Sequence, residues 1–165
     1  MVLNSDEVMR IVKDPLGLAM PQQHGVDLTI KEIYVVKDCT IPAVLAGSTN
    51  PLQWEPRSRR SYCPFEENLQ GWYLAPGLYS LEFDQGVKIP AHCKANIIHR
   101  SSIARCGGQI YSGEYDAGFE TENAGAFLVV HVPFFIEEHA RVAQLVVQEV
   151  KGTIERQYDG QWQGR

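Results

Sequence analysis

The stretch PGLYSLEF, residues 76–83, is the segment that decides the fold class. Its first two residues form a turn dipeptide. Behind them, large apolar residues stand at every second position, Tyr79, Leu81 and Phe83, with polar residues between them. Side chains of a β-strand point alternately to opposite faces, so this alternation predicts a strand with one buried face and one solvated face.

Similar short apolar segments, separated by turn residues, continue on both sides of this stretch. The further strands that we predict are 27–36, 87–90, 95–99, 126–132 and 142–150. One short helix is expected at 4–12, where Asn4 and Glu7 have the spacing of a capping box. Many short strands joined by turns are typical of a closed or double-sheet β architecture.

Length and charge exclude several classes of protein. At 165 residues the chain fits one domain. Its net charge of −5 argues against non-specific binding to nucleic acid, which requires a basic surface. No apolar run reaches the roughly 20 residues that span a bilayer, so we expect no membrane association. The N-terminal residues 1–15 are charged where a signal peptide would be apolar, so we expect a cytoplasmic protein. None of the four cysteines form a CxxC pair, and we expect free thiols in that reducing compartment.

Two segments carry no clear strand pattern. Residues 46–71 are rich in turn dipeptides and contain a basic cluster, Arg57, Arg59 and Arg60. We interpret this stretch as a surface loop or insertion within the single domain 1–165, with a solvated basic face. The C-terminal residues 152–165 are polar and are expected to form a mobile tail unless something orders them.

Two constellations carry residues suited to nucleotide chemistry. Residues 100–105 place two arginines and two serines within six positions, and guanidinium groups bind oxyanions bidentately. The alternative is a short exposed helix with salt bridges. Residues 114–119 hold two carboxylates, a glycine and two aromatics, which suit water activation and sugar packing, or simply form a hairpin turn.

Several known catalytic patterns are absent from the sequence. It contains no GxxxxGK[ST] phosphate loop, no zinc-deaminase signature and no GxSxG nucleophile elbow. The five histidines lack metal-ligand spacing, and we interpret them as structural or surface residues.

Seven motifs follow one another in the order and approximate spacing of the dUTPase/dCTP deaminase family. The chain resembles this family over most of its length outside residues 37–70. The matching motifs are Gly25-Val26-Asp27-Leu28, Pro76-Gly77-Leu78-Tyr79, Val87-Lys88-Ile89-Pro90, Arg100-Ser101-Ser102-Ile103-Ala104-Arg105, Asp116-Ala117-Gly118-Phe119, Arg141-Val142-Ala143-Gln144-Leu145 and the tail YDGQWQGR of residues 158–165.

This resemblance implies a mainly β fold, a distorted jelly-roll barrel, assembled as a homotrimer with sites between subunits. The implied ligand is a pyrimidine deoxynucleoside triphosphate, dUTP or dCTP. The implied cofactor is Mg²⁺, held through the substrate phosphates rather than by protein ligands.

The resemblance also implies a role for each matching residue. Asp116 contacts the deoxyribose and, in the hydrolase branch, activates water, while Phe119 packs against the deoxyribose. The phosphates are held by Arg100, Ser101, Ser102, Arg105 and Arg165. Backbone groups near Ile110, Tyr111 and Glu114 read the base. Supporting roles fall to Asp27, Gln144, Tyr158 and Gln161.

The family has two chemistries, and this chain departs from the deaminase pattern. The deaminase glutamate position falls at Ala126 or Val130, depending on the alignment of a longer turn, and neither residue shuttles a proton. Glu120 or Glu122 would replace it only if that turn folds toward the base. The resemblance therefore favours hydrolysis of dUTP to dUMP and pyrophosphate. A dCTP deaminase, a bifunctional enzyme and a non-catalytic nucleotide-binding protein remain the alternatives.

Overall fold

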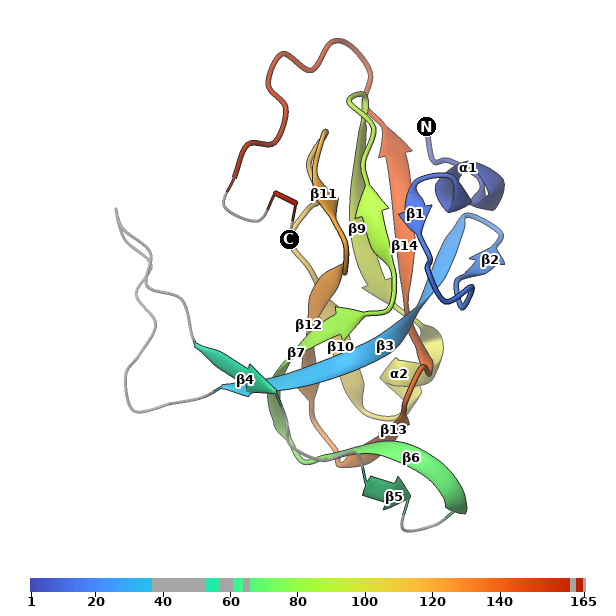
Figure 1. Cartoon of the computed structure of the whole chain (residues 1–165), viewed down its shortest axis with the longest axis vertical. Coiled ribbons are helices and arrows are strands. Elements are labelled where there is room, and N and C mark those ends of the chain that lie inside the picture. The colour runs from blue at the N-terminus through green and yellow to red at the C-terminus, as the bar shows by residue number, and fades with distance from the viewer. Residues whose placement is uncertain (37–52, 57–60, 64–65, 161–162, 165) are drawn as a thin grey trace.

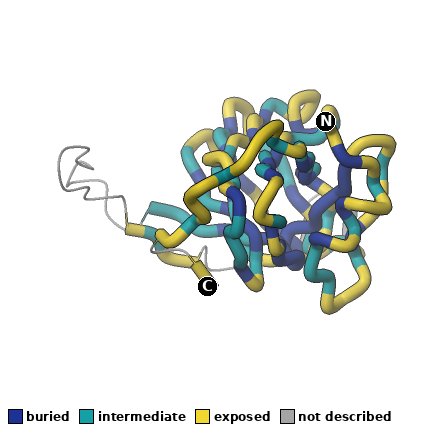
Figure 2. The backbone as a smooth tube through the Cα atoms, turned by 90° about the horizontal axis from the view of Figure 1, so that it is seen from above, coloured by how far each residue is buried: buried dark blue, intermediate teal, exposed yellow. Residues whose placement is uncertain are grey.

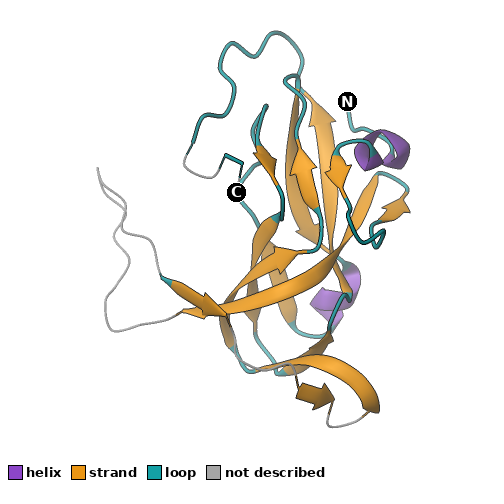
Figure 3. Ribbon diagram, in the orientation of Figure 1, coloured by secondary structure: helices purple, strands orange, loops and turns teal. Residues whose placement is uncertain are grey.

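A computed structural model describes residues 1–36, 53–56, 61–63, 66–160 and 163–164 of the chain. In these residues strands dominate, and the predicted mainly β fold with a short N-terminal helix is confirmed (Figure 3). The helices in this part of the chain, α1 (Ser5–Met9) and α2 (Ser101–Arg105), have five residues each. Neither is long or apolar enough to cross a membrane.

The main sheet has the strand order β10-β12-β7-β3-β14-β9 and is antiparallel throughout. The bounds of its strands are Gly108–Tyr111 (β10), Gly125–Val130 (β12), Gly77–Phe83 (β7), Gly25–Val36 (β3), Arg141–Glu149 (β14) and Cys93–His99 (β9). Two further strands pair with β3, namely β2 (Met20–Gln22) and β4 (Trp54–Pro56).

The long strand β3 bends the sheet toward closure. Its first part pairs with β14 and its last part with β7, and the register shifts near Ile30 in one ladder and near Arg141 in the other. Such irregularities let one strand serve two differently oriented parts of a sheet. The segment after β10 then meets β9 on the far side, where Tyr115 exchanges backbone hydrogen bonds with Ala95 (Figure 1).

Two small antiparallel sheets complete the described part of the chain. One has the order β1-β8-β11, and the other β13-β6-β5. The bounds of these strands are Val12–Lys13 (β1), Gly86–Lys88 (β8), Glu120–Thr121 (β11), Phe134–Glu137 (β13), Glu66–Leu74 (β6) and Ser61–Cys63 (β5).

The core contains the residues that the alternation in 76–83 predicts to be buried. Tyr79, Leu81 and Phe83 are buried, whereas Ser80 and Glu82 are only partly buried on the opposite face of β7. Figure 2 shows the buried backbone running through the centre of the barrel, with exposed loops around it. The outward face of β7 is therefore available to line a site.

Two expectations about local structure were wrong. Residues 46–71 are not simply a loop, because β4, β5 and the first part of β6 lie within them. Turn residues interrupt the local strand pattern here, and the hydrogen bonds come from pairing of β4 with β3, of β5 with β6 and of β6 with β13. The helix predicted at 4–12 ends at Met9, since Val12 pairs with Val87 instead. Its Asn4–Glu7 capping box is confirmed.

The basic cluster of Arg57, Arg59 and Arg60 lies outside the described residues.

Candidate functional site

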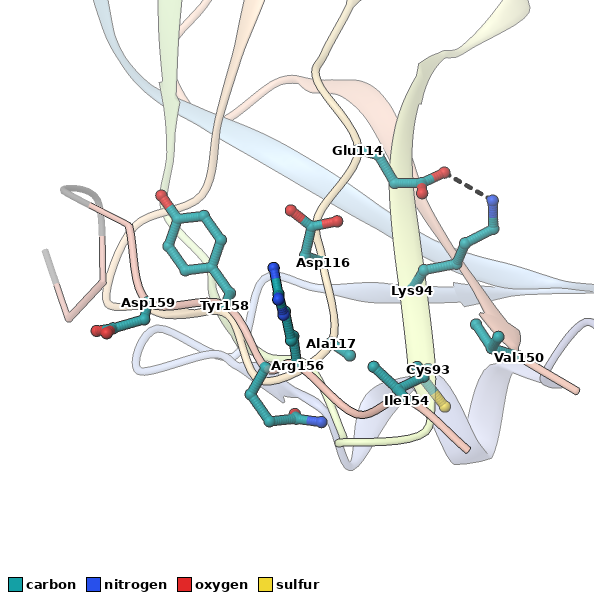
Figure 4. A pocket seen from close by; sticks show the side chains of 11 residues that line it. Cys93, Lys94, Glu114, Asp116, Ala117, Val150, Ile154, Arg156, Tyr158 and Asp159 are labelled. Carbon is teal, nitrogen blue, oxygen red and sulfur yellow. Dashed lines mark hydrogen bonds and ion pairs between the residues drawn. The ribbon is translucent and has the colours of Figure 1, made fainter. Parts of the chain in front are cut away.

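Two cavities meet at the turn after β10. The first, which we call the aromatic pocket, has a volume of about 570 Å³. The second, the tail pocket, has a volume of about 500 Å³ and lies beneath the C-terminal segment (Figure 4). Three residues line both cavities and so mark their junction: Glu114, Asp116 and Tyr158.

Asp116 stands on a turn that the barrel holds in place. The turn is closed by a hydrogen bond from the backbone N–H of Phe119 to the Asp116 carbonyl, and Gly118 adopts a positive φ of 81° within it. The Gly118 N–H donates to the Ile89 carbonyl, and the Ile89 N–H donates to the Phe119 carbonyl. The Asp116 carboxyl is exposed at the cavity junction, so it can reach a bound ligand or water.

Three aromatic rings form one wall of the aromatic pocket. Phe119 packs against Tyr115 at a centroid distance of 4.9 Å, and Tyr158 from the tail meets Phe119 edge-on at 5.1 Å. The Tyr115 hydroxyl donates to the Gly125 carbonyl at 2.6 Å and accepts from the Gly125 N–H at 2.9 Å. The first strand residue of β12 is thereby tied to the wall that carries Phe119.

Replacing Tyr115 by phenylalanine should lower the free energy of unfolding by about 1–3 kcal/mol, because it leaves two backbone groups of Gly125 without a partner. Burial raises the pKa of Tyr115 to about 12, above the unfolded value near 10. The stability from this phenol is therefore complete below pH 10 and is lost as the pH rises through about 12. Urea denaturation at neutral and alkaline pH measures both effects.

Tyr34, whose pKa is also raised by burial to about 12, keeps its alkaline contribution in this variant. Above pH 10 the destabilisation caused by Tyr115→Phe should therefore shrink. The stability of the variant should still depend on pH, because Tyr34 still titrates. A penalty that stays constant up to pH 12 would contradict the assigned hydrogen bonds.

The C-terminal segment folds back along the Asp116 turn. The Tyr158 N–H donates to the Ala117 carbonyl at 2.8 Å, and the Gln163 side chain donates to the Gly118 carbonyl at 2.9 Å. Figure 4 shows the Arg156 side chain directed toward Asp116, on the side of Tyr158. No sequence motif marks Arg156, because it is a single arginine in a polar segment.

A second polar cluster, the arginine cluster, lies where β3, β14 and the end of β9 adjoin. Asp27 is 1% exposed, and its Oδ2 lies 3.1 Å from Arg100 Nε and 3.6 Å from Arg141 Nη1. Gln144 pairs with Asp27 in the sheet register. Burial raises the pKa of Asp27, and the two guanidinium groups oppose that rise.

Helix α2 continues from this cluster. Ile103 is buried and Ala104 is exposed, since a five-residue helix can bury only one narrow face. Ser101 and Arg105 are exposed and Ser102 is partly buried. Among the described residues Arg105 forms no ion pair, whereas Arg100 is bound to Asp27. The salt-bridge interpretation thus fits Arg100, and the Arg105 guanidinium is available to an anion.

Within one chain, the arginine cluster and Asp116 lie far apart. Lys94, which binds Glu114 at 2.7 Å, is the second residue of β9, the strand that ends at His99 next to Arg100. Six residue steps of extended strand measure about 20 Å. Figure 1 shows α2 at the opposite end of β9 from the tail.

The remaining sequence candidates occupy different positions. Ile110 is buried in the core, and Tyr111 stacks on Phe127 at 5.6 Å, so neither side chain lines the two cavities. Their strand pairs with β12, whereas Ser112, Gly113 and Glu114 line the aromatic pocket without a strand partner. Gln161 and Arg165 lie outside the described residues.

A family model described as dCTP deaminase-like matches residues 3–150 of the chain. The chain belongs to the dCTP deaminase-like family.

Curated relatives within this family come from archaea. The chain is 28% identical over 173 residues to a probable deoxyuridine 5'-triphosphate nucleotidohydrolase of Methanosarcina mazei, covering 98% of this chain and 96% of the relative. A protein of the same name from Aeropyrum pernix is 32% identical over 145 residues, covering 87% and 84% of the two chains.

Solved structures share the fold of this dCTP deaminase-like chain. The dCTP deaminase of Agrobacterium tumefaciens superposes with a TM-score of 0.61 at 17% identity, covering 90% of this chain and 48% of that one. The EIAV dUTPase superposes with a TM-score of 0.52 at 11% identity, covering 92% and 97%. The predicted dUTPase-like barrel, a distorted jelly roll, is thereby confirmed.

In this dCTP deaminase-like chain, the acidic residues of the longer turn do not face the pocket. Glu120 and Glu122 each lie 2.6 Å from Lys13, and Lys88 lies 3.2 Å from Glu120. Hydrogen bonds from these lysines lower the pKa of Glu120. Neither glutamate lines the two cavities.

Proposed function

We propose that this protein hydrolyses dUTP to dUMP and pyrophosphate. The observation that carries the proposal is the position of Asp116 at the junction of two unlike cavities. The aromatic pocket offers ring surfaces to a nucleoside, and the tail pocket carries the basic side chains Lys94 and Arg156 for phosphates. The names of the archaeal relatives support the same substrate.

In the proposed reaction, a water attacks the α-phosphorus while the Asp116 carboxylate accepts its proton. The bond from the α-phosphorus to the bridging oxygen breaks, and pyrophosphate leaves. Phosphoryl transfer otherwise depends on positioning and on neutralising charge. Phe119, packed between Tyr115 and Tyr158, would hold the deoxyribose beside Asp116.

Mg²⁺ belongs to this proposal as a partner of the substrate phosphates, where it would neutralise their charge. The residues fit such a loosely held ion: exposed carboxylates of Asp116 and Asp159 line the tail pocket, and Mg²⁺ keeps water ligands beside one or two carboxylates. The described part of the chain offers no group of three or more His, Cys, Asp or Glu side chains for a direct site.

Incubation of the purified protein with dUTP or dCTP and Mg²⁺ tests the function. Release of pyrophosphate from dUTP is the expected result. Release of ammonia from dCTP would identify a deaminase or a bifunctional enzyme, and turnover of neither substrate would indicate a binding protein.

We further propose that the active sites lie between the subunits of a homotrimer. A triphosphate anchored at Asp116 would then meet Arg100, Ser101, Ser102 and Arg105 of a neighbouring copy, since the same chain's arginine cluster lies about 20 Å away along β9. Light scattering on the purified protein should give three times the mass of one chain, and a monomer at micromolar concentration would contradict it.

Replacing Arg105 by alanine should weaken triphosphate binding by about 1.5–3 kcal/mol, the range for a hydrogen bond to a charged group. Because Arg105 is exposed and unpaired among the described residues, the fold should keep its stability. Calorimetric titration with an α,β-imido analogue of dUTP measures the loss. Unchanged affinity would leave Arg105 without a role in phosphate binding.

Mixing this variant with Asp116→Asn tests whether the two residues serve one site from different chains. Subunit exchange between two weakly active proteins should then restore part of the turnover, since some mixed trimers contain one intact site. Activity that remains the sum of the two parents would show that each site lies within one chain.

We also propose a cytoplasmic location, which the unpaired thiols of Cys93 and Cys106 support.

A further inference from the structure

The outward face of β7 supplies an acidic side chain to the aromatic pocket. Ser80 and Glu82 both line it, because alternation along β7 turns them away from the core. In the register of the sheet, Glu82 lies between Glu32 on β3 and Gly125 on β12. Gly125 has no side chain that could cover this carboxylate, and the Glu82 side chain is 27% exposed.

Two donors fix the Glu82 carboxylate. Lys31 Nζ lies 2.6 Å from Oε1, and the Tyr34 hydroxyl donates to Oε2 at 2.7 Å. Lys31 also donates to the Asn123 side chain at 3.0 Å, and Asn123 donates to the Phe83 carbonyl. The carboxylate is therefore held in one place, yet each oxygen keeps acceptor capacity beyond its single bond.

Glu82 lines the aromatic pocket but not the tail pocket, which is the phosphate side of the proposed site. Glu114, Asp116 and Tyr158 line both cavities, but Glu82 and Tyr34 line the aromatic pocket alone. A nucleotide with its deoxyribose at Asp116 and its phosphates toward the tail pocket would direct its base toward Glu82. The other carboxylate nearby, Glu114, is bound to Lys94 and points toward it (Figure 4).

We propose that Glu82 is a specificity-determining residue that accepts the N3–H of uracil. The inference rests on the proposed dUTP hydrolysis. An ionised carboxylate can only accept hydrogen bonds. Uracil offers a donor at N3, whereas cytosine has an unprotonated acceptor nitrogen there, which the carboxylate would repel. Glu82 would thus favour dUTP over dCTP, a preference that the sequence motifs leave open.

A double-mutant cycle between protein and ligand tests this contact. Wild-type protein and Glu82→Met are titrated with the α,β-imido analogue of dUTP and with its N3-methyl derivative, which lacks the donor. Wild type should bind the methylated ligand about 10- to 100-fold more weakly. Glu82→Met should lose about the same factor for the unmodified ligand, and its penalty for N3-methylation should largely disappear.

The matched control is Glu32→Met, because Glu32 lies opposite Glu82 in the sheet but does not line the pocket. It should keep both affinities, and thermal melts should show all three proteins folded. A full N3-methyl penalty in Glu82→Met would overturn the contact while leaving dUTP hydrolysis intact, and so would equal affinity of wild type for both ligands. Wild type that binds neither ligand would refute the proposed function itself.

Discussion

Replacing Asp116 by asparagine is expected to slow dUTP turnover by about 10²-fold or more, the low end of general-base effects. Asparagine keeps the size and most of the hydrogen-bonding capacity of the carboxylate but cannot accept the proton of the attacking water. The turn should keep its conformation, because it is held by backbone bonds among Ile89, Gly118 and Phe119 rather than by the Asp116 side chain. Pyrophosphate release under saturating dUTP measures the loss.

Binding separates a catalytic role from a structural one in this variant. The affinity of Asp116→Asn for the α,β-imido analogue of dUTP should stay within a few fold of wild type, so that kcat falls much more than KM rises. Glu114→Gln is a suitable control, since Glu114 also lies at the cavity junction but is bound to Lys94. If both variants lose turnover equally, the general base is not Asp116.

Replacing Arg100 by methionine is expected to destabilise the fold by about 3 kcal/mol, the low end of the range for breaking a buried ion pair. Asp27 is 1% exposed, and without Arg100 its carboxylate would keep only Arg141, at 3.6 Å. Methionine retains much of the packing of the arginine stem, so the loss reflects the charge. Urea denaturation at pH 7 measures it.

The pH dependence of this loss provides a specific check. Since the pKa of Asp27 is raised above 3.8 by burial, the folded state holds this proton more tightly than the unfolded chain does. Stability from this group therefore falls as the pH rises above 3.8. Removing Arg100 steepens that fall, so the penalty should be smaller near pH 4 than at pH 7.

Two further variants complete the test. Asp27→Asn added to Arg100→Met should restore part of the stability, because it removes the poorly compensated charge. Arg105→Met, on the exposed side of α2, should change stability by no more than about 0.5 kcal/mol. An Arg100→Met protein as stable as wild type would mean that Asp27 is solvated by other groups.

The sequence by itself determined the fold class and the turn that carries Asp116. Alternation of apolar and polar residues is a local property, because successive side chains on a strand face opposite sides wherever that strand pairs. It therefore predicted the buried face of β7 correctly from residues 76–83 alone. The Asn4 capping box was equally readable, since its two partners are three residues apart.

Only the tertiary structure decided which distant residues share a pocket. Strand β6 was missed because turn residues precede it and one of its two partners, β13, lies far along the chain. The position of Glu82 beside Gly125 follows from sheet register, and that of Arg156 beside Asp116 from the path of the tail. Register depends on the packing of whole strands, so no short segment encodes it. The sequence of β7 alone predicts only that Glu82 faces the solvent.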